Sequence, residues 1–187
     1  MNKKILFWAA LLLPLVAFCQ PSPNYIPFFV TGVHDGDTFT ALSQDSVVYK
    51  VRPIGFDAPE IRSNIILETQ PYGRESGDIL RASIKGKWVL LDTTAIKGQS
   101  RDIYGRLLAE VYFSDSSSMA LAMVKGGLAW AVQVPNRKFP KTNTILKDAQ
   151  REAKKNVRGL WFGYLDEKGR KRYPVAPWTH RKKYGIQ

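Results

Sequence analysis

The chain has 187 residues, about the size of one domain, with a single cysteine and two histidines. One cysteine excludes an intramolecular disulfide and a cysteine-ligated zinc site, two histidines disfavour zinc hydrolases, and the lack of a Gly-x-Ser-x-Gly elbow or a Walker loop disfavours serine-nucleophile and nucleoside-triphosphate chemistry. Lys and Arg outnumber Asp and Glu by 28 to 16, which favours polyanionic partners because phosphate binding releases counterions.

The N-terminal segment has the pattern of a secretory signal peptide. Residues 1–4 are polar and basic, and the apolar run at residues 5–18 is too short to span a bilayer comfortably. Cleavage after Cys19 would remove residues 1–19 and leave Gln20 first, so we expect a secreted or periplasmic protein with no stable membrane span in the mature chain. A buried helix or a membrane anchor is one alternative. A lipoprotein acylated at Cys19 is another, although the bulky residue before the cysteine disfavours it.

Short apolar segments rich in β-branched residues predict β-strands after an entry segment with prolines at residues 20–27. Glycine or small polar residues bound each segment. The first two strands are expected to form a hairpin around a turn at residues 34–37. The expected strands are 28–33, 38–42, 47–56, 88–94, 107–113 and 128–132.

Three segments predict α-helices because their apolar residues recur at helical spacing. The clearest is 143–157, where Thr142 or Asn143 can cap the first turn and Gly159 can end the helix. The other two helices, with the glycines expected to end them, are 75–85 with Gly86 and 118–125 with Gly126.

The predicted strands outnumber the predicted helices, and the helices are inserted late in the order of elements. This pattern predicts an α+β fold. We expect a five-stranded Greek-key β-barrel of the OB type with about three helices packed outside it. Residues 166–187 form a tail rich in Lys and Arg, with aromatic side chains at Tyr173, Trp178 and Tyr184. Such a tail either wraps a groove or is a mobile end, and the sequence leaves both interpretations open.

Three clusters of charged residues are separated along the chain. Residues 34–38 set two carboxylates around a glycine in a turn, which suits a hard cation but is also a common hairpin sequence. Arg52 lies in a predicted strand and precedes an acidic turn at residues 57–60, which a proline stiffens. In the third cluster, residues 101–106, a glycine allows close backbone approach just before Arg106.

In their order, these clusters strongly resemble the staphylococcal nuclease (thermonuclease) family: Asp-Gly-Asp-Thr, then Arg before Asp-x-Pro-Glu, then Asp-x-Tyr-Gly-Arg. The similarity extends over approximately residues 29–162. It implies an SNase-like nuclease domain at residues 28–165, between the entry segment and the basic tail. Further matches lie at 70–75, 127–129 and 159–161.

The resemblance implies a calcium site. By this similarity, Asp37 and Asp57 are the side-chain ligands of a Ca²⁺ ion, and the backbone carbonyl of Ala58 is a third ligand. The family often has threonine at the position of Ala58, but a main-chain ligand survives that change. Asp35 is interpreted as a carboxylate that supports the site without binding the ion.

The same resemblance implies catalytic roles for three residues. Glu60 matches the glutamate that orients or deprotonates the attacking water, while Arg52 and Arg106 match the two arginines that hold the scissile phosphate. Asp102 and Tyr104 match positions near the bound nucleotide and are expected to bind substrate. A place in the hydrophobic core is the alternative for Tyr104.

The resemblance implies a secreted, monomeric, calcium-dependent endonuclease that hydrolyses DNA and RNA with low base specificity and leaves 3′-phosphate products. The residue types suit this reaction, because attack on a phosphodiester adds negative charge that fixed cations stabilise. Contacts mainly to phosphate and sugar would give low base specificity. The alternatives are a non-catalytic OB-type module that binds nucleic acid and a non-enzymatic surface protein held by its basic tail.

N-terminal sequencing of the exported protein tests the interpretation of the first segment. Gln20 is expected as the first residue, because the apolar run before it has the length of a signal peptide. An acylated Cys19 at the N-terminus would contradict this expectation and show a lipoprotein.

Overall fold

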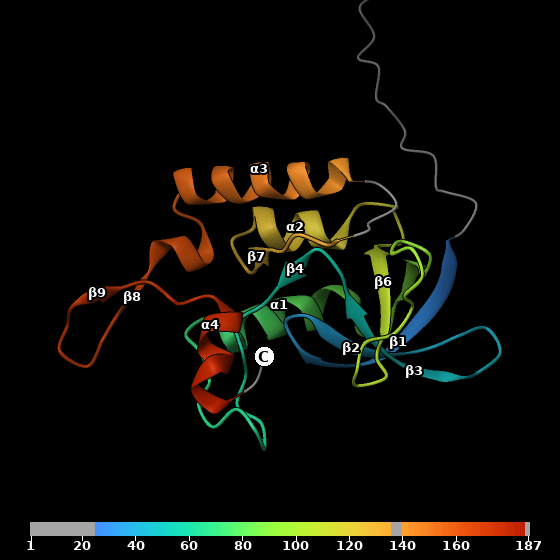
Figure 1. Cartoon of the computed structure of the whole chain (residues 1–187), viewed down its shortest axis with the longest axis horizontal. Helices are drawn as coiled ribbons and strands as arrows, with labels where there is room; N and C mark the ends of the chain where they lie inside the picture. Colours follow the sequence, from blue (N-terminus) through green and yellow to red (C-terminus); the bar gives the residue numbers. More distant parts are fainter. Residues whose placement is uncertain (1–24, 136–139, 186–187) are drawn as a thin grey trace, which may run out of the picture.

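The computed structural model describes residues 25–135 and 140–185, so the predicted signal peptide lies outside the described residues. At its centre is a closed barrel in the order β1-β2-β3-β6-β5 (Figure 1). Neighbouring strands are antiparallel except β3 and β6, which are parallel. The expected α+β fold with an OB-type barrel is confirmed. The barrel strands are β1 (Ile26–Asp35), β2 (Thr38–Leu42), β3 (Val48–Pro53), β5 (Trp88–Asp92) and β6 (Leu107–Tyr112).

Alternation of side chains fixes how the strands face the core. In β2, Phe39 and Ala41 are fully buried, whereas Thr40 and Leu42 are only half-buried. A shift by one residue would turn the apolar pair outward, so burial specifies the register. β1 contains two register shifts against β2, the second between Val33 and Asp35, just before the turn. Such bulges bend the strand and re-aim the side chains that follow.

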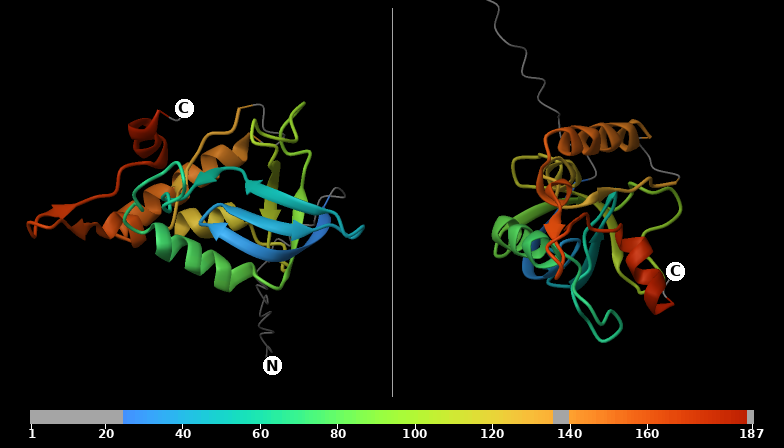
Figure 2. Two further views of the ribbon diagram at one scale, coloured as in Figure 1. Left: turned by 90° about the horizontal axis from the view of Figure 1, so that it is seen from below. Right: turned by 90° about the vertical axis from the view of Figure 1, so that its left-hand side faces the viewer.

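Three helices cover the outside of the barrel, close to the predicted positions (Figures 1 and 2). Their buried residues, such as Leu80, Met123 and Leu146, form one cluster with the inward side chains of the barrel. No helix among the described residues has both the length and the apolar character needed to cross a membrane. The helices are α1 (Gly73–Ile84), α2 (Met119–Lys125) and α3 (Lys141–Lys155).

The predicted ends of the third helix are wrong. Pro140 occupies the N-cap position of α3 without a side-chain cap bond. Asn143 instead uses its amide to bond the main chain of Val134, accepting from its N–H at 3.2 Å and donating to its carbonyl at 3.1 Å. Asn156 ends α3, and Gly159 begins a short 3₁₀ helix, η1 (Gly159–Phe162). Asn143, which was expected to cap α3, therefore binds the main chain of a residue that precedes the helix.

The strand predicted at residues 47–56 divides into two. β3 ends at Pro53, which has no N–H for the ladder, and Gly55 then adopts a φ of 93°. β4 (Phe56–Asp57) leaves the barrel and pairs with β7 (Trp130–Ala131), the only regular part of the strand predicted at 128–132. The break carries the acidic turn away from the barrel wall.

The basic segment after residue 163 folds back on the rest of the domain. A hairpin of β8 (Tyr164–Leu165) and β9 (Lys171–Arg172) first projects away from the rest of the domain (Figure 2). It is followed by α4 (Pro177–Arg181), a fourth helix that sequence analysis did not predict, and by η2 (Lys182–Tyr184). Among the described residues, α4 lies beside the loop that precedes α1, where Glu68 and Gln70 bond to it and to the chain just before it.

The contact between α2 and η1 gives a test of the fold through Gly127. Gly127 has a φ of 70°, and a Cβ added there would lie 2.2 Å from the carbonyl oxygen of Arg158. Gly169 has the same φ of 70°, but a Cβ there would meet no atom within 4 Å. Gly127→Ala should therefore lower the free energy of unfolding by about 1–3 kcal/mol more than Gly169→Ala, as for overpacking. Urea denaturation measures both, and equal losses would contradict the packing.

Candidate active site

The barrel register gathers the three charged clusters at one end. Asp37 lies just before β2, Arg52 is the penultimate residue of β3, and β2 and β3 are antiparallel neighbours. On the other side of β3, the register places Leu107, the first residue of β6, beside Val51. Arg106 immediately precedes Leu107. Residues far apart in the sequence are therefore brought together by strand pairing alone.

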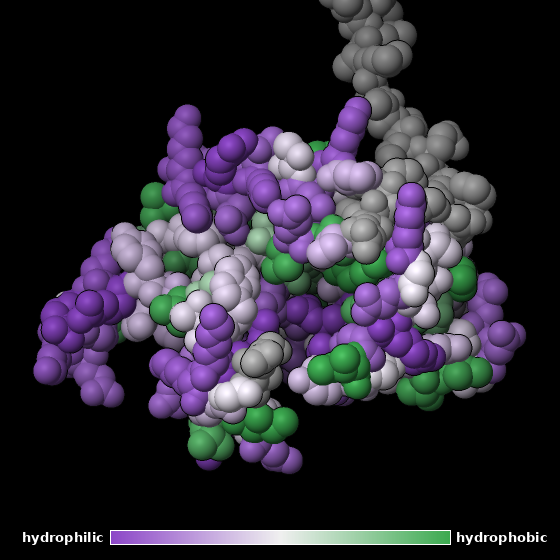
Figure 3. Space-filling model, viewed as in Figure 1, coloured by the Kyte–Doolittle hydropathy of each residue, from purple (hydrophilic) through white to green (hydrophobic). Residues whose placement is uncertain are grey.

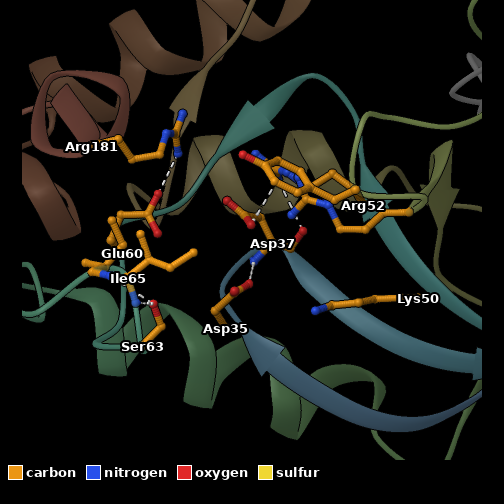
Figure 4. A pocket seen from close by; sticks show the side chains of 11 residues that line it. Asp35, Asp37, Lys50, Arg52, Glu60, Ser63, Ile65 and Arg181 are labelled. Carbon is orange, nitrogen blue, oxygen red and sulfur yellow. Dashed lines mark hydrogen bonds and ion pairs between the residues drawn. The ribbon is translucent and has the colours of Figure 1, made fainter. Parts of the chain in front are cut away.

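A cavity of about 420 Å³ lies at this end of the barrel. In the space-filling view, hydrophilic residues fill the recess between α4 and the barrel (Figure 3). Carboxylates and basic side chains both line the cavity (Figure 4), which suits a ligand that combines a phosphate with a metal cation. The lining residues are Asp35, Asp37, Lys50, Arg52, Glu60, Ser63, Ile65, Ile66, Tyr104, Arg106 and Arg181.

Arg52 connects the two aspartates that are expected to bind calcium. Its Nη1 lies 3.0 Å from Oδ1 of Asp37, and its Nη2 donates to Oδ1 of Asp57 at 2.6 Å. Nη1 also donates to the carbonyl of Phe56 at 3.4 Å. Asp37 and Asp57 are both buried. The guanidinium group thus joins the turn before β2, the end of β3 and the start of β4.

The turn that carries Asp37 is packed tightly against its surroundings. Oδ2 of Asp37 accepts from the N–H of Ala58 at 2.7 Å, and Oδ1 of Asp35 accepts from the N–H of Asp37 at 3.0 Å. A Cβ on Gly36 would lie 2.3 Å from Oγ of Ser76 in α1. The glycine of the Asp-Gly-Asp sequence is therefore required for the turn to rest on α1.

The electrostatics of this acidic cluster fit a cation. Burial raises the pKa of Asp37 well above its ordinary value; Arg52 opposes this rise, while Asp35 and Asp57 add to it. Burial also lowers the pKa of Arg52, but Asp37 and Asp57 more than offset that effect and hold it above its ordinary value. Burial is thus the main cause of the rise, and Asp35 and Asp57 add negative charge beside Asp37.

The protein supplies few side-chain ligands for such a cation. Among residues 25–135 and 140–185, no group of three Asp, Glu, His or Cys residues is arranged to hold a metal ion. An ion held by Asp37 and Asp57 would need further oxygen atoms from the main chain or from water. Ala58 follows Asp57 directly and is buried, and its main-chain carbonyl is the oxygen that the resemblance implies as a third ligand.

Gln70 fixes the position of Glu60. The side-chain oxygen of Gln70 accepts from the N–H of Glu60 at 2.8 Å, and the N–H of Gln70 donates to the carbonyl of Glu60 at 2.9 Å. Oε1 of Glu60 accepts from Nη1 of Arg181 at 2.5 Å. Burial raises the pKa of Glu60 above its ordinary value, and the hydrogen bond from Arg181 opposes that rise.

Asp102 holds Arg106 in place. Its Oδ2 accepts from Nε of Arg106 at 2.6 Å, and its Oδ1 accepts from the main-chain N–H groups of Arg106 at 2.9 Å and Tyr104 at 3.0 Å. Nη1 of Arg106 donates to Oγ1 of Thr38 at 3.4 Å. Tyr104 is 65% exposed, so the alternative of a core position for it is wrong, and its ring centroid lies 5.3 Å from the guanidinium carbon of Arg106.

Sequence analysis missed two basic residues of the cavity. Lys50 stands two residues before Arg52 in β3, so strand periodicity alone places both on the same face. Arg181 comes from α4, and Pro177 at the start of this helix was the one local signal for it. No sequence pattern connects Arg181 with Glu60, which lies much earlier in the chain, so this contact could not be predicted from the sequence.

A closed OB-type barrel with arginines and carboxylates around a cavity at one end defines an SNase-like domain. Residues 50–162 match the family model described as Staphylococcal nuclease homologue. This match covers more than half of the chain, and the chain belongs to the staphylococcal nuclease family. The family expected from the three sequence clusters is thereby confirmed.

Similar proteins from bacteria carry endonuclease names. The chain is 34% identical over 155 residues to an uncharacterized endonuclease of Escherichia coli, covering 82% of this chain and 84% of the relative. It is 34% identical over 161 residues to an uncharacterized endonuclease of Haemophilus influenzae, covering 86% and 79%. Endonuclease YncB of Bacillus subtilis is 32% identical over 142 residues, covering 72% and 62%.

The burial of Arg52 between two carboxylates gives a test of its structural role. In the presence of a chelator, Arg52→Met should lower the free energy of unfolding by about 3 kcal/mol, because the variant leaves buried charges with less compensation. Arg151→Met is the control, since Arg151 pairs with Asp148 on the exposed face of α3 and should cost less than about 1 kcal/mol. Urea denaturation distinguishes the two, and similar small losses would contradict the role of Arg52.

Proposed function

We propose that the protein is a secreted, calcium-dependent endonuclease that hydrolyses DNA and RNA with low base specificity and leaves 3′-phosphate products. The observation that carries the proposal is the convergence of Arg52, Arg106 and Glu60 on one cavity beside the acidic turn of Asp37. The endonuclease names of the relatives from Escherichia coli and Haemophilus influenzae support a nuclease activity. We propose that the protein acts as a monomer.

Calcium would be held by carboxylate oxygens of Asp37 and Asp57 and by the carbonyl of Ala58. The buried excess of carboxylates supports this assignment, because a hard divalent cation prefers oxygen ligands and would offset the charge. The bound ion would supply positive charge beside the scissile phosphate. Arg52 already contacts both aspartates, so the ion and this guanidinium group would lie next to each other.

Arg106 is oriented to receive a phosphate. Asp102 accepts from its Nε and Thr38 from its Nη1, while Nη2 has no hydrogen-bond partner among the described residues. The planar guanidinium group is thus held on one side and presents its remaining donors to the cavity. Asp102 acts on the substrate through Arg106, and the exposed ring of Tyr104 is placed to pack against a sugar or a base.

Glu60 is the proposed base that activates the attacking water. Its Oε1 accepts from Arg181, which leaves Oε2 as the oxygen without a bond among the described residues. A water molecule between Oε2 and the phosphorus would form the new P–O bond as Glu60 takes its proton. The bond from phosphorus to the 5′-oxygen breaks and the leaving oxygen takes a proton from solvent water, which gives a 3′-phosphate and a 5′-hydroxyl. Arg52 and Arg106 stabilise the charge that develops on the phosphate oxygens.

Cleavage assays of the purified protein without residues 1–19 test this proposal. Single-stranded DNA and RNA should be cleaved with calcium and should stay intact with a chelator. Tight binding without cleavage would instead favour the non-catalytic module. The absence of both binding and cleavage would favour the surface protein.

The variants Glu60→Gln and Arg106→Ala should fold normally and lose roughly 10²- to 10⁴-fold in cleavage rate, since each removes a group that acts in the transition state. Lys155→Ala is the control, because this side chain is exposed on α3. Thermal unfolding checks that all three variants are folded. Cleavage by Glu60→Gln at the rate of Lys155→Ala would disprove the assignment of the base.

A further inference from the structure

Arg181 bridges two acidic residues of the site described above. Its Nη1 donates to Oε1 of Glu60 at 2.5 Å, and its Nη2 donates to Oδ2 of Asp57 at 2.8 Å. Nη1 also lies 3.4 Å from Oδ1 of Asp57. The planar fork of an arginine can hold two carboxylates at a fixed separation, which the single ammonium of a lysine does less well. Arg181 therefore links the carboxylate of Glu60 directly to that of Asp57.

Independent contacts hold α4 against the loop that carries Glu60. The ring of His180 is buried, and its Nε2 lies 3.3 Å from the carbonyl of Glu68. The side-chain amide of Gln70 donates to the carbonyl of Val175 at 3.0 Å, while its oxygen accepts from the N–H of Glu60. Gln70 thus joins the main chain of Glu60 to the segment that delivers Arg181. The position of Arg181 is built into the fold and does not depend on its own ion pairs.

We propose that Arg181 is a positioning residue of the active site: it fixes the carboxylate of Glu60 relative to Asp57 and moderates the attraction of the acidic cluster for a divalent cation. This inference rests on the proposed function, because positioning matters only if Glu60 activates water beside a metal ion. Arg181 adds a third arginine to the two that match the family motifs, and it comes from outside the residues matched by the family model.

The formal charges at the site support the second part of the proposal. Four carboxylates surround the acidic end of the cavity. The guanidinium groups of Arg52 and Arg181 contact three of them, whereas Arg106 is paired with Asp102. Lys50 also lines the cavity but has no ion pair with these carboxylates among the described residues. Removing Arg181 takes one positive charge from direct contact with the cluster, so the cation should bind at least as tightly while Glu60 loses its support. The four carboxylates belong to Asp35, Asp37, Asp57 and Glu60.

The test uses Arg181→Ala and Arg181→Lys in the same protein that is used for the cleavage assays. Lys182→Ala is the matched control, because it removes one positive charge from the next residue, which is exposed. For each protein, kcat and KM are measured on single-stranded DNA with calcium. The dissociation constant for calcium alone is measured by titration calorimetry without substrate, and thermal unfolding is followed in parallel.

Arg181→Ala should lower kcat by about 10- to 100-fold, because a misplaced catalytic group costs this much, and leave KM within about threefold. Its calcium affinity should be equal to or tighter than that of the unchanged protein. Added guanidinium ion should restore part of the lost kcat, and Arg181→Lys should lie between Arg181→Ala and the unchanged protein. Lys182→Ala should match the unchanged protein in every measurement.

Three results would overturn the inference. An unchanged kcat in Arg181→Ala would show that Glu60 needs no such support, and a higher kcat would show that Arg181 obstructs the site. A fall in kcat together with weaker calcium binding and earlier unfolding in both Arg181 variants would show a purely structural role. If the unchanged protein itself does not cleave with calcium, the proposed function fails, whereas normal cleavage by both the unchanged protein and Arg181→Ala refutes only the role of Arg181.

Discussion

The buried contact of Arg52 with Asp37 and Asp57 is the constraint on which the site depends. Three segments that strand pairing brings to one end of the barrel meet at this guanidinium group. Removing charges from water is costly unless they are paired, so the acidic turns hold their places only while the arginine compensates them. The break after Pro53 contributes to the same arrangement, because β4 leaves the barrel wall there and Asp57 contacts Arg52.

A second level of organisation lies in the residues that hold the reactive groups. Asp102 fixes Arg106 through contacts with its side chain and main chain, and Gln70 fixes the main chain of Glu60 through its side-chain oxygen and its own main-chain N–H. Neither Asp102 nor Gln70 needs to touch a phosphate to matter. A reactive side chain that is already oriented, with one donor or acceptor unpaired, can bind a charged substrate without the cost of first being ordered.

Sequence analysis predicted the barrel, its three outer helices and the family, because strand alternation, helical spacing and the order of the motifs are local signals. It did not predict features that depend on tertiary contacts. Asn143 has the chemistry of a helix cap, but the nearby main chain of Val134 competes for its amide. Arg181 looked like one more charge in a basic tail, since only the folded chain shows which carboxylates it meets.

The place of Arg181 in the chain also has a consequence for truncation. The three charged clusters belong to the barrel strands and their turns, whereas Arg181 reaches them from α4, beyond the residues matched by the family model. A protease that cut the chain before α4 would therefore spare every strand of the barrel and all three clusters. It would remove the one guanidinium group that contacts both Asp57 and Glu60, so an intact barrel is not the same as a complete site.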